Sequence, residues 1–351
     1  MASQDLSKET VGVIGAGSFG TAVANLLAQN KEVLLYARRP EVAKDLHKNR
    51  IYKGRKLNEA VELTNKLEEL AQRCQLIFPI IPSENFRDML QKLSPYLYPY
   101  HILIHGTKGF SLRLKEGENL DEPTSLNKSQ VQTMSELIRE ETVVRRIGCM
   151  AGPNIAYEID AGEPAATVIA SHFDEVIREG QMALRSSMFR VHGNHDLIGI
   201  ELAGVLKNIM AIVSGIIDGL GYGANTRGLF VTRALAEIVH IGTGLGADPK
   251  AFFGLAGIGD LVTTSTSPRS RNFIVGQRLA KGEKLDEILA SMDEVAEGIK
   301  TVKIIRALVN KHKLAAPITM ALNRTLFEGM DIAKGVRLLM EFPFREDVEF
   351  L

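Results

Sequence analysis

A glycine-rich turn near the start of the chain has the spacing of a dinucleotide-binding site. Residues 15–20 read GAGSFG, follow an apolar run that predicts a strand, and open an amphipathic helix. In such a turn Gly15 permits the tight bend, Gly17 lets the backbone approach a pyrophosphate, and Gly20 lets the helix pack closely on the sheet. The amino end of the helix then holds the phosphates. A strand-to-helix turn without a ligand is the alternative, and this context favours the dinucleotide.

Two arginines follow the second predicted strand, where an enzyme strict for NAD usually has an acid that binds the adenosine ribose. Residues 36–40 read YARRP and contain neither Asp nor Glu. Arg38 or Arg39 can stack on adenine or pair with a 2′-phosphate, which makes NADP physically acceptable. Two solvated arginines in a loop would give the same pattern, so both interpretations stay open.

Lys207 is the one formal charge in residues 202–217, a stretch that predicts a long apolar helix. Such a helix face normally packs against another element, and desolvation lowers the pKa of a lysine toward values that suit proton transfer. We therefore expect Lys207 to act as a general acid/base. A lysine that reaches solvent at the edge of a helix bundle is an equal alternative on this pattern alone. Its helical neighbours are Ala203, Gly204, Met210 and Ala211.

Further polar residues could complete a catalytic site. Lys108 follows the strand predicted over residues 101–105, at the carboxyl edge where doubly wound sheets bind their ligands. Asp260 is the acid of a GIGD turn, and residues 270–272, SRN, supply donors suited to phosphate oxygens. Taken singly, Asp260 also fits a helix cap and Arg271 a solvated turn.

Short β-rich runs predict the sheet that positions the glycine-rich turn. The earlier runs alternate with helical patterns, which indicates a doubly wound parallel sheet. Residues 111–131 are polar and poor in aromatic side chains, so we expect a mobile surface excursion there, followed by a helix from about residue 132. The predicted strands cover residues 11–15, 32–37, 60–64, 75–81, 101–105, 145–149, 165–171 and 188–192.

From about residue 195 onward the periodicity is helical almost throughout. A chain of 351 residues suits two domains of ordinary size. We therefore expect an α/β protein with a Rossmann-type dinucleotide-binding domain over residues 1–194 and an all-helical substrate and catalytic domain over residues 195–351. Breaks between helices are predicted near Gly221, Gly246, Pro268 and Pro317.

Composition argues against several classes of protein. Basic and acidic residues both number 42, so no whole-molecule field draws the chain onto nucleic acid or anionic lipid. The amino terminus lacks an apolar signal segment, and no apolar run reaches the roughly 18 residues that cross a membrane. Cys74 and Cys149 are expected in the core of a protein from a reducing compartment. His192 and His195 are close in sequence, but the eight histidines are otherwise scattered and no cluster of His, Cys and carboxylate residues has metal-ligand spacing. We expect a cytoplasmic protein without metal, nucleic-acid partner or stable membrane insertion.

An ordered series of motifs resembles the soluble, bacterial-type NAD(P)-dependent glycerol-3-phosphate dehydrogenase family. Such a series is far more specific than a glycine motif alone. The resemblance implies hydride transfer between NAD or NADP and carbon 2 of sn-glycerol 3-phosphate or dihydroxyacetone phosphate, which supplies glycerol 3-phosphate for glycerophospholipid synthesis. It also implies a homodimer. The motifs are GAGSFGTA, PIIPS, GTKG, AGPNIAYE, ELAGVLKNIMAI, GLGYGANTRG, GLAGIGDLVTT, SRNFIVG and VAEGIKT.

The resemblance also implies roles for single residues. Lys207 matches the lysine that transfers the proton, Lys108 the lysine that contacts substrate and nicotinamide, and Asp260 the acid that orients or tunes Lys207. Arg271 is expected to reach the substrate phosphate. The substrate-binding positions are Lys108, Gly152, Asn154, Lys207, Asp260, Ser270, Arg271 and Asn272. The cofactor-binding positions are Gly15, Gly17, Ser18, Phe19, Gly20, Arg38, Lys108, Ala156, Arg271, Val295 and Glu297.

Two positions depart from the family pattern. Asn154 stands where a hydroxyl residue is usual, and residues 108–111, KGFS, replace the usual KGxE, so the loop beside the site can close differently. Two other functions agree less well with these motifs. A dehydrogenase of hydroxy acids or acyl thioesters is disfavoured by the ordered motifs of Lys207, Asp260 and Arg271, and a nucleotide-sensing module without turnover is disfavoured by the two lysines.

Overall fold

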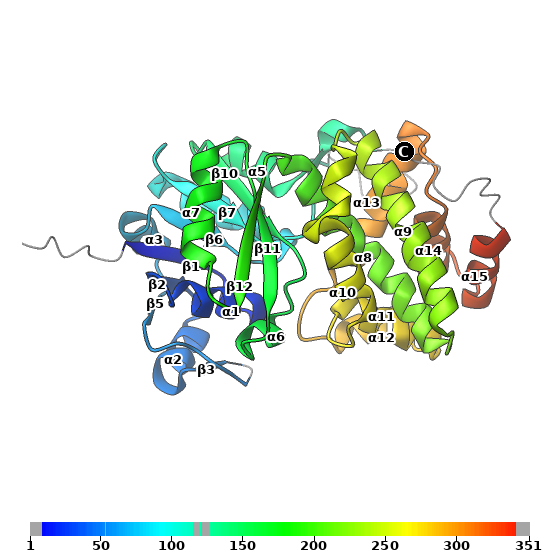
Figure 1. The fold of residues 1–351 in the computed structure, drawn as a ribbon, viewed down its shortest axis with the longest axis horizontal. Helices are drawn as coiled ribbons and strands as arrows, with labels where there is room; N and C mark the ends of the chain where they lie inside the picture. Colours follow the sequence, from blue (N-terminus) through cyan, green and yellow to red (C-terminus); the bar gives the residue numbers. More distant parts are fainter. Residues whose placement is uncertain (1–8, 53, 115–119, 121–125, 342–351) are drawn as a thin grey trace, which may run out of the picture. The chain divides into compact units, whose positions relative to one another are not determined.

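The computed structural model describes the chain except for residues 1–8, 53, 115–119, 121–125 and 342–351 (Figure 1). The chain forms two compact units. Unit 1 contains Met1–Thr107 and Met134–Leu197, and unit 2 contains Lys108–Thr133 and Ile198–Leu351. The expected domain boundary between residues 194 and 195 stays a prediction, because compact units describe which segments pack together and not which segments fold independently.

Unit 1 is built on a sheet that is eight-stranded in the described part of the chain, with the order β12-β11-β10-β7-β6-β1-β2-β5. Every strand predicted from the sequence is present. The strands from β5 to β10 in this order are parallel, as expected, whereas β11 runs antiparallel to β10. The bounds are β1 (Thr10–Ile14), β2 (Glu32–Tyr36), β5 (Val61–Thr64), β6 (Leu76–Pro79), β7 (Ile102–His105), β10 (Arg146–Ala151), β11 (Ala165–Ala170) and β12 (Phe189–Asn194).

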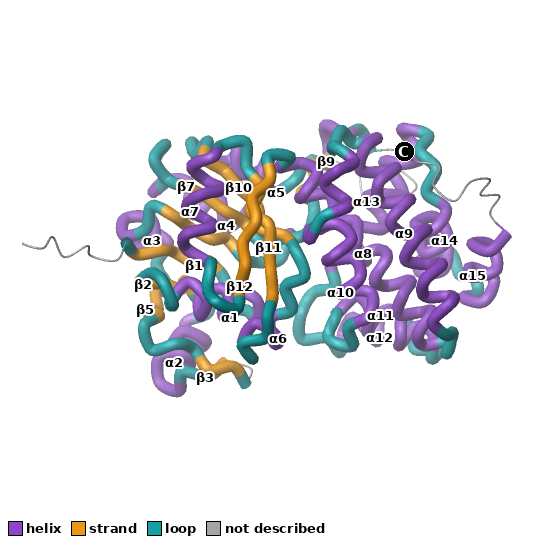
Figure 2. Tube along the Cα trace, in the orientation of Figure 1, coloured by secondary structure: helices purple, strands orange, loops and turns teal. Residues whose placement is uncertain are grey.

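Helices of unit 1 cover both faces of this sheet (Figure 2). Neighbouring residues of one strand enter different cores, since Val13 packs with residues of α1 and α7, and Ile14 packs with residues of α3, α4 and α5. Burial on both faces explains the continuous apolar runs by which the strands were predicted. The helices are α1 (Ser18–Leu27), α2 (Pro40–Asn49), α3 (Leu67–Arg73), α4 (Phe86–Leu93), α5 (Met134–Glu141), α6 (Ala156–Asp160) and α7 (Asp174–Leu184), and a small hairpin joins β3 (Ile51–Tyr52) to β4 (Arg55–Lys56).

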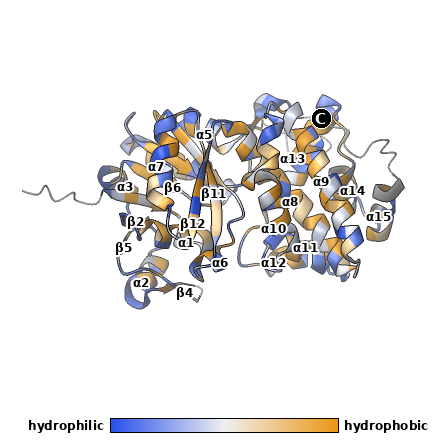
Figure 3. Ribbon diagram, viewed as in Figure 1, coloured by the Kyte–Doolittle hydropathy of each residue, from blue (hydrophilic) through white to orange (hydrophobic). Residues whose placement is uncertain are grey.

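Unit 2 is helical after residue 197, as the periodicity predicted. Its helix α8 is long and apolar enough to cross a membrane by those two criteria (Figure 3), but its most apolar window is entirely buried in the protein. That burial identifies α8 as a core helix. The helices are α8 (Leu197–Gly219), α9 (Ala224–Gly244), α10 (Asp260–Thr266), α11 (Arg271–Ala280), α12 (Leu285–Ala290), α13 (Glu297–His312), α14 (Pro317–Phe327) and α15 (Ile332–Glu341).

Glycines allow α8 and α11 to pack at backbone distance. A Cβ atom on Gly215 would lie 2.0 Å from the carbonyl oxygen of Phe273, and one on Gly276 would lie 1.9 Å from the carbonyl oxygen of Ile212. Neither position accepts a side chain without moving a helix. This close contact places the start of α11 beside the middle of α8, where Lys207 lies.

The described ends of residues 108–133 pack within unit 2 rather than extending from the surface. Strand β8 (Ser111–Leu112) pairs with β9 (Val131–Gln132), and Leu126 is buried. The Lys128 ammonium donates a hydrogen bond to the carbonyl of Leu245 at the end of α9. The prediction of a surface excursion over residues 111–131 is therefore wrong for both ends of this segment, because apolar residues and a lysine anchor these ends. Its middle, residues 115–119 and 121–125, lies outside the described residues.

Candidate active site

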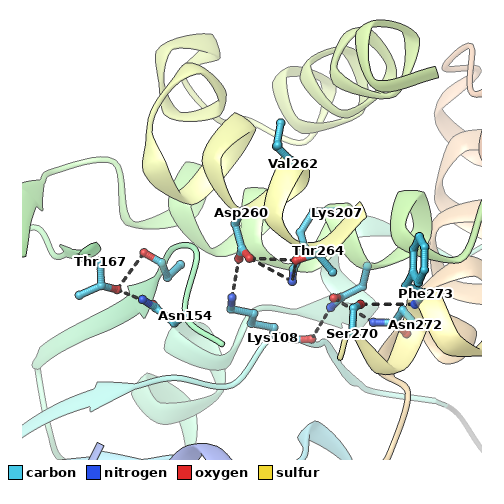
Figure 4. A network of polar contacts seen from close by, with 12 residues as sticks. Lys108, Asn154, Thr167, Lys207, Asp260, Val262, Thr264, Ser270, Asn272 and Phe273 are labelled. Carbon is cyan, nitrogen blue, oxygen red and sulfur yellow. Dashed lines mark hydrogen bonds and ion pairs between the residues drawn. The ribbon is translucent and has the colours of Figure 1, made fainter. Parts of the chain in front are cut away.

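Three polar side chains of unit 2 meet around one buried carboxylate (Figure 4). Lys207 Nζ lies 3.2 Å from Asp260 Oδ1 and donates a 2.6 Å hydrogen bond to Thr264 Oγ1. The Thr264 hydroxyl in turn donates to Asp260 Oδ1 over 3.1 Å. Lys108 forms an ion pair with Oδ2 of the same carboxylate. One carboxylate thus holds two ammonium groups in a fixed arrangement.

Burial sets the electrostatics of this cluster. The side chains of Asp260 and Lys207 are only 3% and 8% exposed, whereas Lys108 is 20% exposed. The alternative that Lys207 reaches solvent is therefore wrong. Desolvation lowers the pKa of Lys207 to about 8; Asp260 opposes this shift and Lys108 adds to it. Burial raises the pKa of Asp260, but the charges of Lys108 and Lys207 outweigh burial and hold it below its usual value.

The local fold explains why Asp260 and Thr264 act together. Asp260 begins α10, so Thr264, four residues later, lies on the same helix face. The turn before α10 is held tightly, since a Cβ atom on Gly257 would lie 2.0 Å from the carbonyl oxygen of Phe252. Gly257 therefore serves packing, while Asp260 is not the cap residue of α10 and binds the two lysines.

The pKa of Lys207 predicts opposite pH profiles for reduction and oxidation. A charged Lys207 can donate a proton and a neutral one can accept it, so kcat/KM for reduction should fall about tenfold per pH unit above about 8, and kcat/KM for oxidation should fall similarly below that pH. Steady-state rates in both directions between pH 6 and 10 would test this. Parallel profiles in the two directions would contradict it.

Asparagines connect the Lys108 backbone to two helices. Asn272 Nδ2 donates to Asn208 Oδ1 over 3.0 Å, and Asn272 Oδ1 accepts from the Gly298 amide over 3.0 Å. Asn208 Nδ2 donates to the Lys108 carbonyl over 3.4 Å. Asn272 is expected to bind substrate. Both the nitrogen and the oxygen of its side-chain amide form hydrogen bonds within the protein, and these contacts make it a positioning residue. Its substrate role stays a prediction.

Sequence reasoning assigned no role to Thr264 or Asn208. The signal for Thr264 was its spacing of four residues from Asp260 in a predicted helix. The signal for Asn208 was a second polar residue beside Lys207 in an apolar stretch. The sequence does not show which residues Thr264 and Asn208 contact, because these contacts form only where α8, α10 and α11 pack together.

Arg271 begins α11 and is half exposed. Its Nη1 donates to the Val295 carbonyl over 2.9 Å and lies 3.6 Å from Glu294. Its charge contributes to the lowered pKa of Lys207, which places it within electrostatic reach of the cluster. Ser270, predicted to bind substrate, caps α11 by accepting from the Phe273 amide over 3.3 Å. Val295 is about one third exposed and Glu297 begins α13; their cofactor contacts stay predictions.

The glycine-rich turn of unit 1 has the geometry that its spacing predicted. Gly15 has a φ of +121°, and a Cβ atom there would lie 2.2 Å from the Ile80 carbonyl oxygen. A Cβ atom on Gly20 would lie 1.8 Å from the Gly15 carbonyl oxygen. Gly17 differs, because no described atom lies within 4 Å of the corresponding point. Packing within the chain explains Gly15 and Gly20, whereas the open space at Gly17 fits close approach by a ligand.

A pocket of about 220 Å³ lies between this turn and the end of β2, entirely within unit 1. Gly17, Arg38 and Asn85 line it, and Arg38 Nη1 lies 3.5 Å from Asn85 Oδ1. Gly17 is the N-cap of α1 and, as a glycine, has no side chain that could cap the first turn. A helix N-terminus, glycine backbone and arginine charge match the phosphates and adenosine of a dinucleotide, so the residues present fit NAD or NADP.

Other predicted cofactor positions lie close to this turn. Ser18 opens α1, and the Phe19 ring packs against Gly106, where a Cβ atom would lie 3.3 Å from the ring. Both residues therefore lie beside the glycine motif and the end of β7. Their contacts with the cofactor stay predictions.

The segment after β10 is anchored on β11. Asn154 Nδ2 donates to the Ala166 carbonyl over 3.1 Å, and Asn154 Oδ1 accepts from Thr167 Oγ1 over 2.8 Å (Figure 4). Gly152 has a φ of +156°, and Ala156 begins α6. The Asn154 amide thus shapes this turn, and its contact with substrate stays a prediction.

Comparisons with known proteins cover nearly the whole chain. The family models for the N-terminus and C-terminus of NAD-dependent glycerol-3-phosphate dehydrogenase match residues 10–177 and 196–337. The glycerol-3-phosphate dehydrogenase (NAD(P)+) of Ectopseudomonas mendocina (strain ymp) is 39% identical, over 98% of this chain and 97% of the relative. That of Pseudomonas aeruginosa (strain LESB58) is 38% identical, over 98% of both chains.

Solved structures agree with these relatives. The crystal structure of glycerol-3-phosphate dehydrogenase from Coxiella burnetii has a TM-score of 0.84 at 29% identity and covers 95% of this chain and 99% of its own. A ketopantoate reductase from Ralstonia eutropha JMP134 has a TM-score of 0.55 at 13% identity, covers 93% of this chain and 99% of its own, and shares the fold alone.

Proposed function

The chain belongs to the NAD-dependent glycerol-3-phosphate dehydrogenase family, and on that basis we propose that it transfers a hydride between NAD(P)(H) and carbon 2 of sn-glycerol 3-phosphate or dihydroxyacetone phosphate. The observation that carries this proposal is the buried cluster of Lys207, Asp260, Thr264 and Lys108. An ammonium whose pKa is about 8 can both give and take a proton near neutral pH.

In reduction, Lys207 donates its proton to the carbonyl oxygen of dihydroxyacetone phosphate. Asp260 and Thr264 hold its Nζ and therefore fix the direction of transfer. Lys108 stabilises negative charge that develops on the same oxygen. The reduced nicotinamide, when bound, supplies the hydride. Oxidation reverses these steps, with neutral Lys207 as the base.

Arg271 and the amino end of α11 bind the substrate phosphate in this proposal. An arginine fork and a helix N-terminus are both suited to phosphate oxygens. The chain of Asn208 and Asn272 keeps this helix end and the Lys108 backbone in register. A phosphorylated triose is therefore favoured over an unphosphorylated one.

A direct assay tests the proposal. Purified protein should oxidise NADH or NADPH when mixed with dihydroxyacetone phosphate, and should form glycerol 3-phosphate. Two compounds serve as controls. Dihydroxyacetone lacks the phosphate, and ketopantoate is a different carbonyl substrate. Turnover of ketopantoate without turnover of dihydroxyacetone phosphate would contradict the proposal.

Arg38 should favour NADPH over NADH. Its guanidinium lines the pocket at the end of β2, where a 2′-phosphate extends from the adenosine ribose. Arg38→Ala should raise KM for NADPH about threefold to tenfold, because an exposed charge contact contributes modestly, and should change KM for NADH less. Initial rates with each cofactor would measure this. Equal use of both cofactors before and after substitution would remove Arg38 from the site.

We further propose a cytoplasmic homodimer with domains over residues 1–194 and 195–351, which supplies glycerol 3-phosphate for glycerophospholipid synthesis. The balanced charge and the buried α8 support the location, and membership of the family supports the dimer and the metabolic role. The molecular mass measured by scattering in solution would test whether the protein is a dimer.

A further inference from the structure

Helix α4 adds a charged pair to the pocket at the end of β2. Asp88 and Lys92, one helical turn apart, form a 2.8 Å ion pair, and their side chains are 56% and 62% exposed. Both residues line the pocket that also contains Gly17 and Arg38. The glycine motif and the arginines predicted this pocket from the sequence, but the predicted site contained no residue of α4.

The charge of this pocket suits a phosphate monoester. Its described lining carries three cations, Arg38, Arg39 and Lys92, and one anion, Asp88. A ribose diol is neutral and needs no cation, whereas a 2′-phosphate is close to doubly negative near neutral pH. The excess of positive charge therefore matches a ligand that has this phosphate.

Tyr36, the last residue of β2, shows that the cations share one location. Burial raises the pKa of its phenol, and the charges of Lys92 and Arg38 both act in the opposite direction. Lys92 and Arg38, which are far apart in sequence, thus act on the same partly buried phenol. Asp88 acts on it with the opposite sign.

We propose that Lys92 binds the 2′-phosphate of NADPH together with Arg38, and that Asp88 opposes this phosphate, so that the pair on α4 sets cofactor choice. The inference rests on the proposed function, because it concerns the cofactor of that reaction. With NADPH, Lys92 turns from Asp88 toward the phosphate. With NADH, Asp88 accepts hydrogen bonds from the ribose hydroxyls.

This arrangement gives two substitutions of opposite effect. Lys92→Ala removes a cation and should weaken binding of a 2′-phosphate, whereas Asp88→Asn removes an anion and should strengthen it. Both side chains are more than half exposed, so neither change disturbs the core. Lys281→Ala is the matched control, because Lys281 is an exposed lysine of unit 2 that does not line this pocket.

The test measures binding of adenosine 2′,5′-bisphosphate and adenosine 5′-monophosphate by calorimetry, apart from any turnover. The wild type should bind the bisphosphate about tenfold more tightly. Lys92→Ala should reduce that ratio about threefold to tenfold, Asp88→Asn should increase it at least about twofold, and Lys281→Ala should leave it unchanged. The ratio of kcat/KM for NADPH and NADH should move in the same directions. The chain has no tryptophan, so emission from bound NADPH provides a clean second titration.

Two results would overturn the inference. A wild type that binds both adenosine phosphates equally has no 2′-phosphate subsite, and a Lys92→Ala variant that weakens both ligands equally shows that Lys92 is structural. The proposed function fails separately, if dihydroxyacetone phosphate is not reduced with either cofactor. In that case, the titrations with adenosine 2′,5′-bisphosphate still test whether the 2′-phosphate subsite exists.

Discussion

Lys207→Met should fold normally, bind NADPH with unchanged affinity, and lose nearly all turnover of dihydroxyacetone phosphate. Replacing a buried charge by an apolar group of similar size usually does little harm to stability. The ion pair of Asp260 with Lys108 remains in the variant, so no buried carboxylate is left without a cation. The reaction loses its proton donor, which typically contributes about 10²- to 10⁴-fold to the rate.

A trace of activity should persist, since Lys108 binds the same carboxylate and can partly replace the missing charge. Lys311→Met, at the exposed end of α13, is the matched control and should keep wild-type turnover. The measurements are kcat, the melting curve and an NADPH titration on each protein. Turnover within about threefold of wild type, on folded Lys207→Met, would show that the proton comes from elsewhere.

Arg271→Ala should raise KM for dihydroxyacetone phosphate strongly and change cofactor affinity much less. A charge-assisted hydrogen bond to phosphate contributes roughly 1.5 to 3 kcal/mol, hence about 10- to 100-fold in affinity. Arg271 is 47% exposed and 3.6 Å from Glu294, so solvent screening and this neighbour favour the lower part of that range.

The exposed Arg269, two residues earlier in the same loop, offers a matched control. Arg269→Ala should leave KM within about twofold of wild type, since exposed charges contribute little. If KM is unchanged in Arg271→Ala, or rises equally in both variants, Arg271 is not the phosphate ligand.

The parts of the fold that depend on local pattern could be predicted from the sequence. Burial on both sheet faces makes the central strands β1, β6 and β7 nearly continuous apolar runs, and the three glycines of residues 15–20 have a spacing that few other turns require. The reversed direction of β11 left no such mark, because strand direction depends on pairing with β10 rather than on the residues of β11.

The same distinction applies to the candidate site. Lys207 could be found because a single charge in an apolar helix is visible in the sequence. Thr264 and Asn208 gain their meaning only from partners on other helices. The resemblance assigns Asn154 and Ser270 to the substrate site, which stays a prediction, and the structure uses their polar atoms to anchor a turn and to cap a helix. Lys92 gave no such signal, because only the folded chain shows that this residue of α4 lines the pocket at the end of β2.

The central claim is that hydride passes between the nicotinamide and carbon 2 of a phosphorylated triose. Isotope transfer tests it most directly: NADPH carrying deuterium at the transferred position of its nicotinamide is mixed with dihydroxyacetone phosphate, and the product is analysed by mass spectrometry and NMR. We predict sn-glycerol 3-phosphate with one deuterium on carbon 2, formed in step with NADPH loss and nearly absent with Lys207→Met. NADPH consumption that leaves carbon 2 unlabelled, or no product at all from folded wild-type protein, would contradict the claim.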